Sequence, residues 1–200
     1  LLYRAAAKTK FEQPDGTLTN KLVYLDMEEY RDLLITVDAF MQTLDRKGLE
    51  QVGAGIALQA YVPDSWLAQQ RINAWAKERV AGGGAPVTIR LVKGANMEAE
   101  RVEASLHGWP LATFSDKLDT DANYKGMLLS ALEPETIAAV RLGVASHNLF
   151  EVAYALVLAQ GRGVLEQVQF EMLEGMANHQ RRALCEFAES MLLYAPATRR

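Results

Sequence analysis

The sequence predicts an α/β fold and, within that class, an incomplete (β/α)8 barrel of the TIM type with about seven of its eight strands. Short apolar runs alternate with segments of helical periodicity along the 200 residues, which is typical of a parallel sheet. Polar side chains recur at the carboxyl ends of these runs, the edge where barrel enzymes build their sites. A doubly wound dinucleotide-binding sheet needs a glycine-rich turn between its first strand and helix, and the glycines at 53–55 and 161–163 lie elsewhere.

The first unit follows a short helical piece and a polar turn at Gln13–Gly16. Its strand is predicted at 22–26 and ends in the carboxylate Asp26. The helix after it should end near Gly48, a suitable C-cap. Apolar residues recur at helical spacing on one face of this helix, namely Tyr30, Leu33, Val37, Phe40, Met41 and Leu44.

The next two units carry most of the polar residues of interest. A strand at 54–60 has Gln59 near its end, and Asp64 or Ser65 should cap a helix that runs to about residue 80. Three glycines at 82–84 then connect to the run Val87-Thr-Ile-Arg-Leu-Val-Lys-Gly-Ala-Asn-Met97. This run begins as a buried parallel strand, and a helix to about residue 106 follows it.

The second half of the chain adds four predicted strands, at 111–114, 142–148, 168–173 and 191–194. Thr120-Asp121 is expected to cap a helix through residue 132, and a short helix should begin at Pro134. The helix at 150–160 is nearly all apolar, so we expect it to be packed deeply. The last helix should run to residue 189.

Composition restricts the class of protein. Half of the residues are hydrophobic and the net charge is -4 with both signs interspersed, so nothing indicates nucleic-acid binding. The single cysteine, Cys185, excludes an internal disulfide, and no apolar run reaches the ~18 residues of a membrane span. There is no initiator Met and the chain stops in mid-pattern, so we expect residues 1–200 to be one barrel domain truncated at both ends.

Arg90 and Lys93 are the strongest site candidates that the residues alone provide. A buried cation needs a partner, and no acid within their strand supplies one, so a neighbouring strand's carboxylate or a bound anion must do so. With Asp26, Gln59 and His147 at other strand ends, the set describes a site for an anionic ligand. No spacing supports a metal site.

Two reaction classes remain open at this point. Lys93 or Lys117 at a strand end suits a Schiff-base aldolase. A cation beside a flavin would instead stabilise the reduced, anionic ring during hydride transfer. A non-catalytic barrel fragment is a third alternative.

Five motifs, in order and spacing, resemble those of the proline dehydrogenase family, in the flavin-binding barrel domain of bifunctional proline-utilisation enzymes. They are Leu25-Asp-Met-Glu-Glu29, Arg90-Leu-Val-Lys-Gly-Ala95, Lys117-Leu-Asp-Thr-Asp121, Ser146-His-Asn148 and Leu173-Glu-Gly-Met176. The resemblance implies FAD-dependent oxidation of L-proline to 1-pyrroline-5-carboxylate, the first step of proline catabolism to glutamate, with electrons passed to membrane quinone. It further implies a C-terminal 1-pyrroline-5-carboxylate dehydrogenase domain in the parent chain, a homo-oligomeric parent, and a cytoplasmic enzyme peripheral to the inner membrane.

The resemblance assigns roles by matched position. Asp26 and Arg90 match the catalytic residues, and Arg90 would lie beside the reactive flavin nitrogen. Leu173 and Tyr194 match residues that contact or shape the proline pocket. The remaining matches are to residues along FAD, namely Met27, Gln59, Val92, Lys93, Gly94, Ala95, Lys117, Ser146, His147 and Asn148.

Three departures accompany this resemblance. Asn96-Met97 stand where some members have Tyr-Trp. The family's substrate-binding lysine should lie before Leu1, and its carboxylate-binding Arg-Arg pair should lie about fifteen residues beyond Tyr194, so Arg199-Arg200 come too early. Without the first strand and the last helix, two sheet edges would be unpaired, which invites association or local unfolding. A substrate carboxylate without bidentate arginines also loses its strongest hydrogen bonds, so we expect the isolated chain to be impaired and at best a weak FAD binder.

Overall fold

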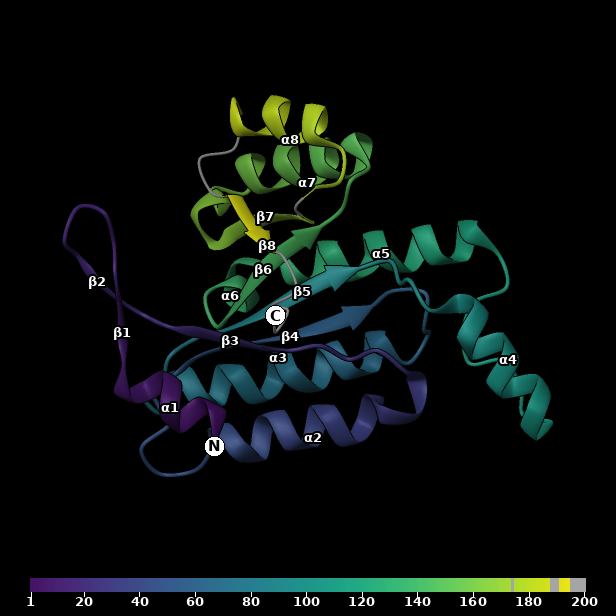
Figure 1. Cartoon of the computed structure of the whole chain (residues 1–200), viewed down its shortest axis with the longest axis horizontal. Helices are drawn as coiled ribbons and strands as arrows, with labels where there is room; N and C mark the ends of the chain where they lie inside the picture. Colours follow the sequence, from purple (N-terminus) through teal and green to yellow (C-terminus); the bar gives the residue numbers. More distant parts are fainter. Residues whose placement is uncertain (174, 188–190, 195–200) are drawn as a thin grey trace.

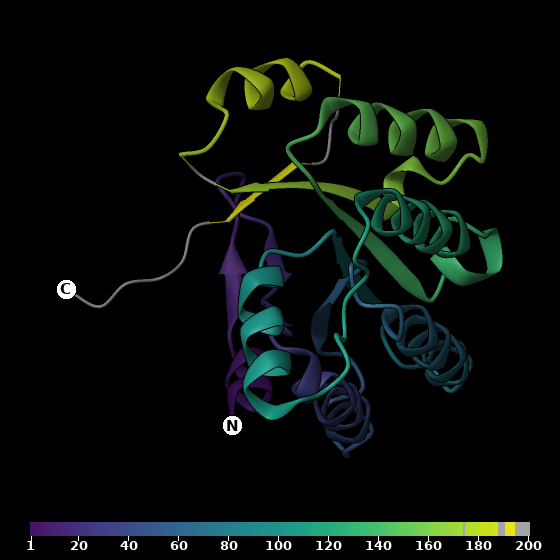
Figure 2. The ribbon, with the colours of Figure 1, turned by 90° about the vertical axis from the view of Figure 1, so that its right-hand side faces the viewer.

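The computed structural model describes residues 1–173, 175–187 and 191–194, the last four by their backbone alone. Six parallel strands form one sheet in chain order: β3 (Leu22–Leu25), β4 (Gly53–Gln59), β5 (Val87–Val92), β6 (Val140–Ala145), β7 (Val168–Leu173) and β8 (Met191–Tyr194). The sheet curls and its helices lie on the outside (Figures 1 and 2). The predicted incomplete barrel is confirmed.

Residues alternate along the central strands between an apolar outer face and a small or polar inner face. The outer residues pack against the helices and are at most 1% exposed: Ile56, Leu58, Ile89, Leu91, Leu142, Val144, Phe170 and Met172. On the inner face, Gly55 and Gly143 leave room for larger polar side chains from other strands. This polar interior therefore distinguishes the barrel from one filled with aliphatic layers.

The helices that cover the sheet are α2 (Leu33–Leu44), α3 (Ser65–Ala81), α5 (Lys117–Ala131), α6 (Pro134–Ile137), α7 (Leu149–Gly161) and α8 (Asn178–Cys185). Short 3-10 turns lie at η1 (Tyr30–Asp32) and η2 (Leu165–Gln167). The apolar face predicted for α2 is confirmed for Leu33, Val37, Phe40 and Leu44, which are buried, and Met41 is half-buried. Tyr30, predicted on the same face, instead lies in η1 before the helix and is exposed. Asp64 is the N-cap residue of α3, as predicted, although its side chain makes no capping hydrogen bond.

One predicted strand is wrong, so the described sheet has six parallel strands rather than about seven. Residues 111–114 form bends, held to the β4–α3 loop by the hydrogen bond that Phe114 N donates to Tyr61 O at 2.8 Å. Strands β5 and β6 are hydrogen-bonded directly to each other, with Val87 opposite Val140. No place remains between them for a further strand.

Three helix predictions also need correction. Helix α2 ends at Leu44, and Gly48, with φ +85°, lies in the turn beyond it rather than at the C-cap. Asp116, not Thr120-Asp121, caps α5, because its side chain accepts a hydrogen bond from Leu118 N. Helix α7 buries only one face, and Phe150 at its start is 88% exposed. The end predicted for the last helix at residue 189 lies outside the described residues.

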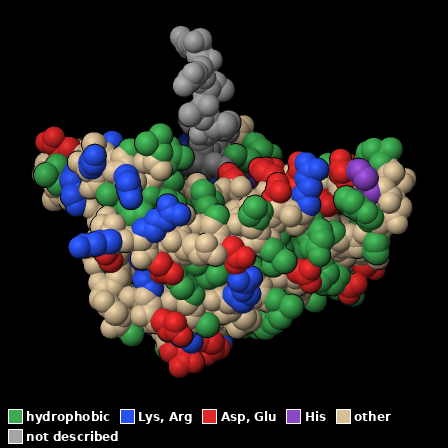
Figure 3. Space-filling model, turned by 90° about the horizontal axis from the view of Figure 1, so that it is seen from below, with side chains coloured by type: hydrophobic (Ala, Val, Ile, Leu, Met, Phe, Trp, Pro, Cys, Tyr) green, Lys and Arg blue, Asp and Glu red, His purple; other side chains and the backbone are tan. Residues whose placement is uncertain are grey.

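Two elements project from the barrel. The N-terminal helix α1 (Leu2–Lys8) leads into the antiparallel hairpin β1–β2 (Lys10–Glu12 and Leu18–Asn20), which turns at Gln13–Gly16 as predicted. Helix α4 (Met97–His107) extends away from the carboxyl end of β5 and buries none of its residues (Figure 1). Acidic and basic side chains are interspersed on the face in Figure 3. Within the described part of the chain, every helix is too short or too polar to cross a membrane.

Candidate functional site

A cavity of about 490 Å³ opens at the carboxyl ends of the inner strands. It brings together eleven of the residues predicted for the site: Asp26, Met27, Gln59, Arg90, Val92, Lys93, Gly94, Ala95, Ser146, His147 and Leu173. These residues come from five strands and the turns that follow them, and parallel strands present all these ends at one edge. The volume lies within the range of small-molecule and cofactor sites.

Arg90 and Glu171 form an ion pair inside the curl of the sheet. Arg90 is 4% and Glu171 1% exposed, and the Nε of Arg90 contacts Oε2 of Glu171. The Nη1 of Arg90 lies 3.4 Å from Oδ1 of Asp26, whose side chain is 59% exposed. Glu171 supplies a carboxylate partner for Arg90, but from β7, two strands away, rather than from a neighbouring strand.

Tyr24 completes this buried cluster. The guanidinium carbon of Arg90 lies 4.1 Å from the centre of the Tyr24 ring, a cation–π contact. The Tyr24 hydroxyl donates to Oε1 of Glu171 at 3.1 Å. Burial raises the pKa of Glu171, whereas Arg90 in contact with it acts in the opposite direction. An arginine stays protonated at accessible pH, so the contact favours the ionised pair.

Gly143 allows the ion pair to form between strands that are not adjacent. Arg90 on β5 pairs in register with Gly143 on β6, and β7 lies beyond it. A Cβ on Gly143 would overlap with Oε1 of Glu171. The carboxylate therefore reaches across β6 because this position has no side chain.

The loop after β3, which carries Asp26 and Met27, is fastened from two sides. Gln59 Nε2 donates to the carbonyl oxygens of Met27 and, at 3.0 Å, Glu28. Asn96 Nδ2 donates to the carbonyl of Glu28 at 3.1 Å and to its carboxylate at 2.6 Å. Asn96, at the departure from the family pattern, thus holds the β3 loop to the turn after β5.

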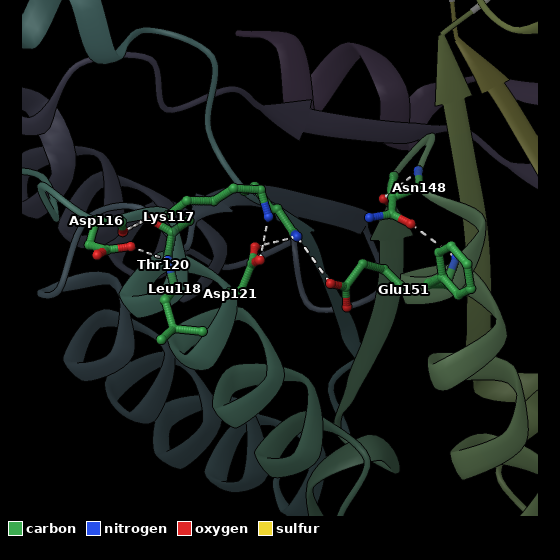
Figure 4. Close-up of polar contacts among 10 residues, drawn as sticks. Asp116, Lys117, Leu118, Thr120, Asp121, Asn148 and Glu151 are labelled. Carbon is green, nitrogen blue, oxygen red and sulfur yellow. Dashed lines mark hydrogen bonds and ion pairs between the residues drawn. The ribbon is translucent and has the colours of Figure 1, made fainter.

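The turn at Lys93–Ala95 is fixed by close packing and by charge. Gly94 has φ +127°, and a Cβ there would overlap with the Tyr61 ring. Lys93 Nζ lies between Asp121 of α5 and Glu151 of α7, which accepts at 3.0 Å. Figure 4 shows these two carboxylates facing each other from their helices. Burial works against the charge on Lys93, but these hydrogen bonds outweigh it and raise its pKa.

This arrangement disfavours the aldolase alternative. A Schiff-base lysine reacts as the neutral amine, which requires a lowered pKa. Lys93 is held in its protonated form by two carboxylates, and Lys117 forms an ion pair with Asp121 while its side chain is 78% exposed. Lys93 therefore does not lie in the apolar or cationic surroundings that would release its proton.

Two predicted site residues, Lys117 and Asn148, do not line the cavity, and a third, Tyr194, is described only by its backbone. Lys117 begins α5 and faces solvent beside Asp121 (Figure 4). The Asn148 side chain caps α7 by accepting from Phe150 N at 3.0 Å. The backbone of Tyr194 ends β8, and its side chain lies outside the described residues.

Sequence reasoning weighed Glu171 only as part of an unsupported metal group with Asp26 and His147, and it gave Tyr24 no role in the site. The signal was present, because Gln169 and Glu171 alternate with Val168, Phe170 and Met172 along β7. A charged residue on the opposite face from a continuous apolar set must point into the barrel. Attention to strand ends alone left this carboxylate out.

The cavity has features that fit the flavin expected from the resemblance. Gln59 Oε1 and His147 Nδ1 are buried beside it and have no hydrogen-bond partner within the described structure. His147 Nε2 accepts from Leu173 N at 3.3 Å, so Nδ1 carries the proton and is a free donor. An unpaired acceptor, an unpaired donor and a fixed cation suit a ligand with mixed polar edges. Among the described residues no acidic, His or Cys cluster is arranged to hold a metal ion.

A second and larger cleft, of about 790 Å³, lies outside the barrel beside α4. Its lining combines apolar groups such as Trp109 and Leu111 with acids from α4 and from the β3–α2 connection. Figure 3 shows hydrophobic and acidic side chains mixed at the end of the molecule where α4 projects. None of the residues predicted for the site lines this cleft.

Comparison with known proteins supports one family. The family model described as proline dehydrogenase matches residues 16–199. A curated proline dehydrogenase of Deinococcus radiodurans is 26% identical over 176 residues, which are 87% of this chain and 48% of that protein.

Solved structures agree with this match. Proline utilization A from Corynebacterium freiburgense is 44% identical with a TM-score of 0.88, over 98% of this chain and 19% of that one. Proline utilization A from Bdellovibrio bacteriovorus, inactivated by N-propargylglycine, is 32% identical with a TM-score of 0.82, over 89% of this chain and 18% of that one. The chain thus spans about half the length of the curated relative and about a fifth of the solved proteins.

Proposed function

Because this chain belongs to the proline dehydrogenase family, we propose that residues 1–200 form part of the barrel domain of an enzyme that oxidises L-proline to 1-pyrroline-5-carboxylate with FAD. The observation that carries the proposal is the strand-end cavity. It holds the cation Arg90 beside two unpaired polar atoms, Gln59 Oε1 and His147 Nδ1. Eleven residues assigned from the resemblance converge on it.

The reaction removes two electrons and two hydrogens from proline, one as hydride from carbon and one as a proton from nitrogen. FAD, when bound, would supply the acceptor for the hydride. Arg90 would place a fixed positive charge beside the site where negative charge develops. Asp26, exposed at the cavity rim, would hold the substrate nitrogen, and Leu173 would pack against the proline ring.

The other residues around the cavity would hold the cofactor. Gln59 and His147 would offer an acceptor and a donor to its polar edges. The turn from Val92 to Ala95 would run along it, with Met27 and Ser146 at its sides. We include Lys117, at the start of α5, Asn148, the N-cap residue of α7, and Tyr194 in the proposed site from the resemblance alone.

We extend the proposal to the parent protein. Its electrons would pass to membrane quinone, and its product would enter the pathway to glutamate through a C-terminal 1-pyrroline-5-carboxylate dehydrogenase domain. We propose a homo-oligomeric, cytoplasmic enzyme that meets the inner membrane peripherally. These statements rest on the resemblance to bifunctional proline-utilisation enzymes, and the two solved proteins of this kind are about five times longer than this chain.

Visible absorption of the purified full-length protein tests the proposal. Flavin bands that bleach when L-proline is added would support it, and a colourless protein unchanged by added FAD and proline would refute it. Asp26→Asn should keep the flavin bands but slow the bleaching, because the exposed Asp26 lies at the rim rather than within the buried cluster. Lys77→Met, at an exposed ion pair on α3, is the matched control and should bleach at the wild-type rate.

A further inference from the structure

Glu171 is the most deeply buried acidic residue in the described part of the chain, and none of the roles above uses it. A carboxylate enclosed to this degree costs free energy unless it is paired and hydrogen-bonded. Its two oxygens have separate partners: Oε2 contacts Arg90, and Oε1 accepts from Tyr24 at 3.1 Å. Glu171 is therefore built into the site in one orientation.

We propose that Glu171 is the counter-ion of Arg90 and its positioning residue, and that by offsetting the arginine's charge it sets how strongly the site favours the reduced form of a bound flavin. The inference rests on the proposed flavoenzyme function. It assigns Glu171 no contact with substrate or cofactor, because the carboxylate acts through Arg90.

The geometry separates the two carboxylates beside Arg90. Asp26 lies 3.4 Å from Nη1 with its side chain 59% exposed, so water screens its charge. Glu171 has a fully buried side chain and contacts Nε, so its charge is screened far less. Of these two carboxylates, Glu171 therefore offsets more of the charge on Arg90.

Orientation follows from the same contacts. The Tyr24 ring lies 4.1 Å from the guanidinium carbon and supports the plane of the group. The Nε contact with Glu171 fixes its rotation within that plane and leaves the Nη groups toward the cavity side, where Asp26 lies. The Tyr24 hydroxyl also donates a hydrogen bond to Glu171, so Arg90, Tyr24 and Glu171 each contact the other two.

The strand between the two partners supports the assignment. Gly143 lies opposite Arg90 on β6, and a Cβ there would overlap with Glu171 Oε1. Strand β6 thus has no side chain at Gly143, and the Glu171 carboxylate occupies the space that a side chain would take. Gly143→Ala should displace the carboxylate from Arg90 without changing any charged residue.

The test is the reduction potential of FAD in the full-length protein, measured by spectroelectrochemistry. Glu171→Gln keeps the shape and an acceptor oxygen for Arg90 but removes the negative charge. The equilibrium should shift at least tenfold toward reduced flavin, about 30 mV for a two-electron couple. Gly143→Ala should shift it in the same direction. Glu166→Gln, which removes an exposed carboxylate from η2, is the matched control and should leave the potential unchanged.

A readout that needs no cofactor separates this inference from the proposed function. The Nε–H resonance of Arg90, observed by ¹⁵N NMR in the cofactor-free protein, should move in Glu171→Gln and not in Glu166→Gln. A protein that binds no flavin would refute the proposed function, while this resonance would still decide whether Glu171 is the partner of Arg90. A wild-type flavin that bleaches with proline, together with an unchanged potential in Glu171→Gln, would overturn the inference.

Discussion

Gly94→Ala should be among the most damaging single-methyl substitutions in the chain. Gly94 has φ +127°, where a residue with a Cβ is strained by about 1–3 kcal/mol. The added Cβ would also overlap with the Tyr61 ring, and overpacking of this kind costs about 1–3 kcal/mol more. Together these effects predict a loss of about 2–6 kcal/mol in unfolding free energy.

Gly83→Ala provides the matched comparison. Gly83 also has positive φ, +87°, but nothing lies within 4 Å of the position that a Cβ would take. It should therefore carry the backbone strain alone, and the difference between the two variants isolates the contact with Tyr61. That difference should be about 1–3 kcal/mol, or about 2–4 °C in Tm for each kcal/mol.

Urea unfolding of both variants measures the stability difference, and FAD titration measures its consequence. Gly94 belongs to the turn beside the cavity, so Gly94→Ala should also weaken FAD binding, whereas Gly83 lies on the α3–β5 connector away from it. Equal destabilisation of the two variants with equal FAD affinity would contradict the close approach of Gly94 to Tyr61.

Three further predictions concern the charges around Lys93. Lys93→Met should lower the unfolding free energy by about 2 kcal/mol, because Glu151 loses its cation; the loss stays below the about 3–5 kcal/mol of a fully buried pair. Lys77→Met, at an exposed ion pair, should change the unfolding free energy by under about 0.5 kcal/mol. Equal urea midpoints for the two variants would refute this ranking. Hydrogen bonds from Lys117 and Lys93 hold the pKa of Asp121 below its ordinary 3.8. This carboxylate therefore stabilises the fold above pH 3.8, and its contribution is lost as the pH falls through the lowered pKa. Asp121→Asn should make the unfolding free energy fall less steeply with decreasing pH in the acid range, and an unchanged slope would contradict this coupling of protonation to stability. Borohydride with a carbonyl substrate should trap no adduct on Lys93 or Lys117, which peptide mass spectrometry would check.

Much of the fold could be predicted because the signals are local. The apolar run of β5 and the helical spacing of apolar residues on α2 each predict which residues are buried from a window of only a few residues. The recurrence of polar groups at strand ends distinguished a barrel from a doubly wound sheet. Short runs were less reliable: 111–114 has the composition of a strand, but the direct pairing of β5 with β6 excludes it.

Positions in the site were predicted better than partners. The strand ends that carry Gln59, Arg90 and His147 follow from the parallel order, since one edge collects them all. The partner of Arg90 did not follow, because Glu171 lies 81 residues away and two strands across. Pairing at that separation depends on register and on sheet curvature, which no local pattern encodes.

Periodicity and motif spacing were enough to predict the alternation of strands and helices and the family, and residue type led to the prediction of an anionic ligand. The pairing of the charges, in contrast, depends on the three-dimensional fold. It placed Lys93 between Asp121 and Glu151, and it brought Glu171 to Arg90 across Gly143. Those pairings set the charge that a ligand would encounter, and they arise from the curl of the sheet rather than from any single segment.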